Sequence, residues 1–148
     1  MITMESKYDF PESLIERAVN AALAHQKKSL DVNLSVVLTD NRRLRKLNRD
    51  YLGVDAPTDV LSFPASEIDP ETGARYIGDI LISVPYAVKG AKQAGNSLAA
   101  ELQLLVVHGV LHLLGHDHAK PKEKSKMWKA QAQILESLGL GDVVIREE

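Results

Sequence analysis

The chain has no cysteine among its 148 residues, which excludes disulfide frameworks, thiolate metal sites and cysteine nucleophiles. Its N-terminus lacks the basic start and apolar run of a secretory signal. No stretch approaches the roughly 20 apolar residues that span a bilayer. We therefore expect a cytoplasmic protein with no membrane partner, in which histidines and carboxylates supply any metal ligands.

An excess of basic charge is also absent. The formal net charge is −2, which is unlike the basic character typical of a nonspecific nucleic-acid binder. Any contact with a polyanion must therefore come from a local patch, and we expect no DNA partner. The length and the 45% hydrophobic composition predict that residues 1–148 form one small domain.

Hydrophobic periodicity divides the chain into helices and strands. The predicted helices cover 11–28, the segment between Asp40 and Gly53, 85–94, 98–114 and 121–138, and the predicted strands cover 32–38, 60–63 and 76–83. The turn residues DPETG between the last two strands predict a hairpin loop. Because strands and helices do not alternate regularly, this order favours an α+β fold over a doubly wound parallel sheet.

Two of these helices carry more specific expectations. The segment 98–114 has leucine or valine on every side, so it should be buried through the centre of the domain. In the helix after Asp40, we expect Leu44, Leu47 and Tyr51 to face inward. The strand at 32–38 alternates apolar and polar residues, which predicts one buried face.

Three histidines have spacings suited to one metal ion. His108 and His112 are four residues apart on the central helix and so share one face. Gly115 can adopt the left-handed conformation that ends the helix and turns His118 back toward this pair. Three protein ligands with an open fourth position are typical of catalytic zinc. The simpler alternative is that His108 and His112 are core residues with hydrogen-bonded nitrogens.

The same segment, HGVLHLLGHDH, holds two further polar residues. His116 is a possible fourth ligand, but it precedes His118 by only two positions and the turn would have to aim both side chains inward. We therefore assign the metal to His108, His112 and His118. Asp117 is expected to orient a ligand. Imidazole sites also accept nickel and copper, so one zinc ion is expected per chain and nickel or another divalent ion is an alternative.

Gly109 distinguishes this site from metal-dependent peptidases. The spacing H-x-x-x-H-x-x-G-x-x-H is that of metzincin proteases, which carry a glutamate as general base where this chain has Gly109. Without that carboxylate, peptide hydrolysis loses a contribution of roughly 10²–10⁴ in rate. A zinc-dependent peptidase or amidase is therefore the alternative, and a phosphodiester is the favoured substrate.

Three motifs in order resemble those of the bacterial YbeY family of rRNA maturation factors. They are LNRDYLGVDAPTDVLSFP, GDILIS and HGVLHLLGHDH. The resemblance implies a zinc-dependent, single-strand-specific endoribonuclease that acts in maturation of the 3′ end of small-subunit rRNA and in ribosome quality control. It also implies zinc at His108, His112 and His118, and a mixed sheet covered by helices with the metal in a cleft. The implied partners are RNA, the small ribosomal subunit and its assembly factors.

One position departs from the family pattern. Many members have an arginine after the tyrosine of the LNxxY segment, and this chain has Leu52 there. The phosphate-binding role of that arginine cannot be carried over directly. Arg49, three residues earlier, is the candidate that could reach a similar place on the helix and steady a phosphate.

Two carboxylates and two basic clusters complete the candidate site. Asp59 and Asp79 lie beside or within apolar strands, so they are candidates for proton transfer, although a turn cap and a solvent-facing strand position explain them equally well. The RNA-binding candidates are Arg42, Arg45, Lys46 and Arg49 on one predicted helix, with a second cluster at 120–129. Such runs are also common on solvated helix faces.

Two aromatic residues and one further function remain open. Trp128 and Tyr51 are suited either to core packing or to stacking on bases. A third functional hypothesis is a ribosome-assembly factor whose metal is structural and whose nuclease activity is incidental.

Overall fold

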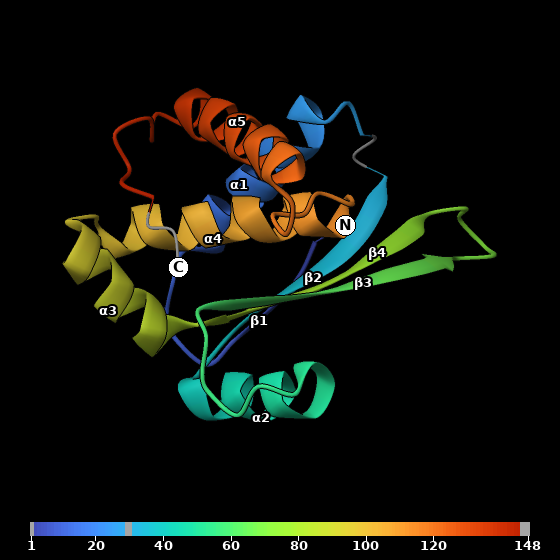
Figure 1. Cartoon of the computed structure of the whole chain (residues 1–148). Coiled ribbons are helices and arrows are strands. Elements are labelled where there is room, and N and C mark those ends of the chain that lie inside the picture. Colours follow the sequence, from blue (N-terminus) through green and yellow to red (C-terminus); the bar gives the residue numbers. More distant parts are fainter. Residues whose placement is uncertain (1, 29–30, 146–148) are drawn as a thin grey trace.

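The computed structural model describes residues 2–28 and 31–145. The described strands are β1 (Ile2–Ser6), β2 (Val32–Thr39), β3 (Val60–Ile68) and β4 (Arg75–Ser83). The described helices are α1 (Glu12–His25), α2 (Asn41–Leu52), α3 (Val84–Ala94), α4 (Leu98–Leu113) and α5 (Pro121–Ser137). Together they form a small α+β domain, as the order of elements predicted (Figure 1).

The strands form one mixed sheet in the order β1-β2-β4-β3. β1 and β4 both pair parallel to β2, whereas β3 pairs antiparallel to β4. The hairpin loop at DPETG is confirmed, because the Asp69 N–H donates to the carbonyl of Ala74 and the Gly73 N–H donates to that of Asp69. Sequence periodicity missed β1, although Ile2 and Met4 alternate with polar residues there and pack against the core.

β3 is longer than the apolar run that predicted it. The strand continues through Pro64 to Ile68, and its register with β4 shifts between Pro64 and Glu67. Proline lacks the N–H that an interior strand needs, but β3 is an edge strand and tolerates it. Pro64 therefore does not mark the end of the strand.

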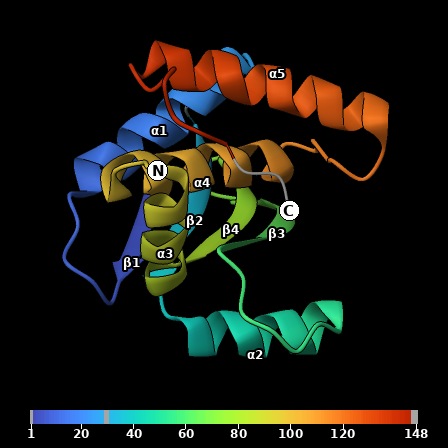
Figure 2. The same cartoon turned by 60° about the vertical axis from the view of Figure 1, so that its left-hand side comes forward.

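Helix α4 lies against one face of the sheet, with α1 and α5 on its outer side (Figure 2). Twelve of its residues are buried, which confirms the prediction of a central buried helix. The principal core forms here, where Ile80 and Ile82 of β4 meet Val106 and Val110 of α4. This packing fixes the position of α4 over the sheet.

Helix α2 covers part of the opposite face (Figure 1). Leu44 packs with Val37, Leu61 and Leu81 in a second, smaller cluster, so both faces of β2 are buried near its end. The prediction that only one face of β2 is buried was wrong for this reason. Tyr51 was also expected to face inward, but it is 68% exposed and makes an edge-to-face contact with Phe63, with ring centroids 5.4 Å apart.

Side-chain caps begin α2 and α4. Asp40 caps α2 by accepting from the Arg43 N–H, and Ser97 caps α4 by accepting from the Ala100 N–H. Gly53 ends α2 in the left-handed conformation, as predicted. Within the described residues, no single helix combines the length and hydropathy of a membrane span; α3 and α4 meet that test only as a pair, bent by 112°.

Candidate metal centre

Three imidazoles converge where α4 ends. One candidate ligand nitrogen from each of His108, His112 and His118 lies within 4.8 Å of the others. The Nε2 atoms of His108 and His112 are 3.2 Å apart. Two nitrogens on one tetrahedral zinc are roughly 3.3 Å apart when each Zn–N distance is about 2.0 Å. The donor set therefore fits a single divalent ion.

The chain turn after α4 brings the third histidine to this pair. Gly115 has a positive φ of 97°, and the N–H of His116 donates to the carbonyl of Leu111 to close the helix end. Asp117 accepts from the backbone N–H of His118 at 2.7 Å, so it helps to fix the turn that carries this ligand. His116 turns away and bonds Gln26 at 2.7 Å, which agrees with its omission from the ligand set.

A buried glutamine orients one of the ligands. Gln131 of α5 is 1% exposed, and its Oε1 accepts from Nδ1 of His108 at 3.0 Å. With the proton held on Nδ1, the lone pair of Nε2 is directed at the other histidines. Such a partner fixes both the tautomer and the ring orientation of a metal ligand. Sequence reasoning missed Gln131 because it lies 23 residues away on another helix.

Burial favours the neutral form of two of these histidines, His108 and His112. Burial, helped by the nearby His108 and His118, lowers the pKa of His112 to about 4. Burial also lowers the pKa of His108, although the bond to Gln131 opposes this shift. Neutral imidazole is the form that binds a metal ion, so little proton competition is expected near neutral pH.

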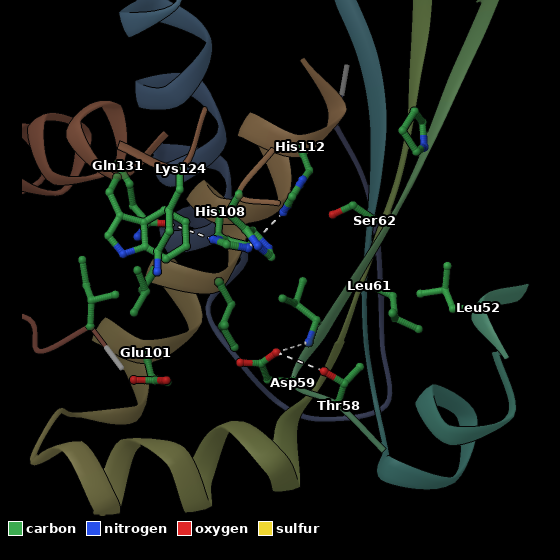
Figure 3. Close-up of a pocket in the computed structure, with 17 residues that line it drawn as sticks. Leu52, Thr58, Asp59, Leu61, Ser62, Glu101, His108, His112, Lys124 and Gln131 are labelled. Carbon is green, nitrogen blue, oxygen red and sulfur yellow. Dashed lines mark hydrogen bonds between the residues drawn. The ribbon is translucent and has the colours of Figure 1, made fainter. Parts of the chain in front are cut away.

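The three histidines open into a cleft of about 490 Å³ between α4, α5 and the edge strand β3. Figure 3 shows Lys124 and Gln131 on the α5 side of the histidines, and Ser62, Leu61 and Leu52 on the opposite side. Asp59 and Glu101 lie below the histidines in the same view. The ligands, two carboxylates and one ammonium thus share one concave surface.

The wall at β3 carries hydroxyl and carboxylate groups. Asp59 accepts from the N–H of Val60 at 2.7 Å and from the hydroxyl of Thr58 at 3.4 Å. Ser62 donates to the carbonyl of Gly109 at 3.4 Å and so ties β3 to α4. Of the two carboxylates predicted for proton transfer, Asp59 is therefore the one in the cleft.

Asp79 is not brought to the metal cleft. It shares the opposite face of the sheet with Leu81, and it accepts from the hydroxyl of Tyr76, which is also bonded to Ser35. Alternation along β4 explains this position, because the flanking Ile80 points toward α4 and Asp79 must point away. This corrects the expectation that Asp79 serves the metal site.

The basic cluster on α2 also lies across the sheet from the histidines (Figure 1). Arg42 and Lys46 are exposed, Arg45 pairs with Asp55 at 2.8 Å, and Arg49 pairs with Asp50 at 3.2 Å. Arg49 does not line the cleft, so the structure does not support its replacing the family arginine there. RNA binding by the α2 cluster stays a prediction, separate from the cleft.

Gly109, which stands where metzincins carry their glutamate, faces the sheet. A Cβ atom at Gly109 would lie 2.8 Å from Cγ2 of Ile80, so α4 can sit this close to β4 only with glycine there. A glutamate at position 109 would meet the core instead of the cleft.

Comparison with known proteins gives consistent matches along the chain. A family model described as Endoribonuclease YbeY matches residues 2–139. The Endoribonuclease YbeY of Moorella thermoacetica is 44% identical over 135 residues, covering 86% of each chain. That of Acetivibrio thermocellus is 39% identical over 139 residues, again covering 86% of each chain.

A solved structure is also similar over the full length. A solution structure of a Thermotoga maritima protein has a TM-score of 0.60 and 26% identity, and the match covers 100% of this chain and 99% of that one. The similarity thus includes the sheet, α4 and the segment that carries the three histidines.

Proposed function

Because the chain belongs to the YbeY family of endoribonucleases, we propose that it cuts single-stranded RNA in the cleft beside His108, His112 and His118, using a bound divalent ion. The observation that carries this proposal is the convergence of three imidazoles inside a cleft. Zinc is the ion we propose, since three imidazole ligands with an open fourth position suit it.

We propose a different role in phosphodiester cleavage for each group of residues in the cleft. When bound, the ion supplies Lewis acidity toward a phosphoryl oxygen and lowers the pKa of water. Gln131 holds His108 in the tautomer that leaves Nε2 available. The hydroxyls of Thr58 and Ser62 line the wall at β3, and each can donate to a phosphate oxygen once it gives up its 3.4 Å bond to Asp59 or to the carbonyl of Gly109.

We assign proton transfer to Asp59. Its Oδ1 is held by the N–H of Val60, so the carboxylate has a fixed direction at the cleft wall. In that position it can accept a proton from an attacking water or ribose hydroxyl. Glu101, the other carboxylate of the cleft, accepts from the side chain of Asn96 at 3.1 Å.

The RNA we propose as substrate is the 3′ end of small-subunit rRNA, met in the cytoplasm on the small ribosomal subunit with its assembly factors. The support is the resemblance of the three sequence motifs to the family of rRNA maturation factors. A peptidase is not supported, because the residue at the glutamate position of metzincins is Gly109, which faces Ile80.

Metal removal and restoration test the proposed reaction. The protein is stripped with a chelator, reloaded with zinc, and incubated with single-stranded RNA, duplex RNA and a peptide library. We expect zinc-dependent cutting of single-stranded RNA alone. Zinc-dependent peptide hydrolysis would support the peptidase instead. The third outcome is that the reloaded protein cuts no RNA, while the stripped protein binds small-subunit particles as tightly as the untreated protein does. That result would support an assembly factor with a structural metal.

A further inference from the structure

We propose that Lys124 and Trp128 of α5 hold the nucleotide next to the cleaved phosphate, the indole by stacking on its base and the ammonium by binding its phosphate. This inference rests on the proposed cutting of RNA in the same cleft. Many family members have an arginine at the position of Leu52. In this chain, Lys124 on the opposite wall of the cleft would supply the cation instead.

Trp128 adjoins the metal ligands directly. Its ring centroid lies 5.8 Å from that of His108 and 5.6 Å from that of His118, and the indole is nearly perpendicular to both imidazoles. The side chain is half-buried and lines the cleft. Its Nε1 is buried and has no hydrogen-bond partner among the described residues. An aromatic surface at this place offers a stacking platform to any base, whatever the sequence.

Lys124 is set apart from the other lysines of its helix. It is half-buried in the cleft, whereas Lys122, Lys126 and Lys129 are exposed. Lys124 and Trp128 are four residues apart on one face of α5, and Nζ lies 5.6 Å from the ring centroid. Because Nζ lies over the ring, a base that stacks on this face displaces the ammonium, which then meets the phosphate of the same nucleotide.

The positive charge of Lys124 also matters for attracting a phosphodiester to the cleft. In the described part of the chain, Lys124 is the only lysine or arginine that lines the cleft, alongside Asp59 and Glu101. Lys124 is therefore the described side chain whose charge can attract a phosphodiester into the cleft.

The test uses the single tryptophan of the chain as its own reporter. The metal-loaded protein is titrated with a short single-stranded 2′-O-methyl oligonucleotide, whose integrity is checked afterwards. Binding is followed by tryptophan fluorescence and by anisotropy of a labelled strand, at several salt concentrations. The variants are Lys124→Gln, Trp128→Phe and Trp128→Leu, with Lys129→Gln as the matched control for loss of one exposed lysine on the same helix. Cutting of single-stranded RNA by the wild type is measured in parallel.

We expect the single strand to quench Trp128 and the matching duplex to leave it unchanged. Lys124→Gln should reduce the slope of log affinity against log salt by about 0.7, with no change for Lys129→Gln. Trp128→Leu should weaken binding by about 5- to 100-fold, and Trp128→Phe should retain most of it because the stacking surface remains. A purely structural role would be served by leucine as well as by phenylalanine.

The two proposals fail differently. If the wild type cuts single-stranded RNA, yet Trp128 is not quenched and the two lysine variants bind alike, the role of this pair is overturned and the nuclease stands. If the reloaded wild type cuts no RNA, the proposed function itself is overturned.

Discussion

Gly109 of α4 packs directly against Ile80 of β4, with the position of a Cβ atom only 2.8 Å from Cγ2 of the isoleucine. We predict that Gly109→Ala destabilises the protein. Overpacking costs about 1–3 kcal/mol, and this exceeds the gain in helix propensity from alanine of about 1 kcal/mol. Urea denaturation should therefore show a net loss of about 1 kcal/mol.

A double-mutant cycle isolates the contact between Gly109 and Ile80. Ile80→Ala removes the atoms that the new methyl group would meet, so the double variant should be more stable than the two single losses predict. Additive losses, or a more stable Gly109→Ala protein, would contradict close packing of α4 on β4.

Gln131 should determine the affinity for the metal. Gln131→Leu leaves Nδ1 of His108 without its acceptor and frees the ring to turn, so we expect metal binding to weaken about 10- to 100-fold. Competition against a chelator measures this change. Gln103→Leu is the matched control, because Gln103 is also buried but bonds the carbonyl of Ala99. Equal affinities in the two variants would argue against an orienting role.

The stability of the metal-free protein should depend on pH through His112. Its folded pKa of about 4 lies below the ordinary value of 6.5, so the fold disfavours the charged form. This penalty is absent above pH 6.5 and grows as the pH falls from 6.5 toward 4. Thermal unfolding of stripped protein should therefore occur at progressively lower temperature across this window. His112→Gln should flatten the dependence, and a variant with an unchanged profile would contradict the assignment.

Gly115 should be required for the third ligand. Its positive φ of 97° suits glycine, and we expect Gly115→Ala to cost about 1–2 kcal/mol. The same strain should move His118 and weaken metal binding. Gly115→Asn should lose less, because asparagine tolerates this region better. Denaturation and chelator competition on both variants measure the two effects, and full metal affinity in Gly115→Ala would show that the turn does not position His118.

Local patterns were sufficient for much of this fold. The spacing of His108 and His112 and the glycine at 115 predicted the convergence of the trio, because helix geometry and a left-handed turn are local properties. The caps at Asp40 and Ser97 were readable for the same reason. The five helices and three of the four strands found in the described residues were all predicted, though with shifted ends.

Features that depend on distant pairing were not readable. β1 is short, and it joins the sheet only by pairing with β2. Asp59 and Asp79 looked alike in sequence, because the residues of a strand do not specify which of its faces will pack against α4. Gln131, Lys124 and Trp128 enter the cleft only because α5 packs on α4. Arg49 was expected near the cleft because periodicity does not specify the side of the sheet on which α2 lies.

The central claim is that one metal ion held by His108, His112 and His118 is needed to cut RNA. Its most direct test measures bound metal and cutting of single-stranded RNA in His112→Ala, with His116→Ala as the matched control from the same segment. We predict that His112→Ala loses both the metal and the activity, while His116→Ala, whose side chain bonds Gln26, retains both. Full RNA cutting by a folded, metal-free His112→Ala protein would contradict the account.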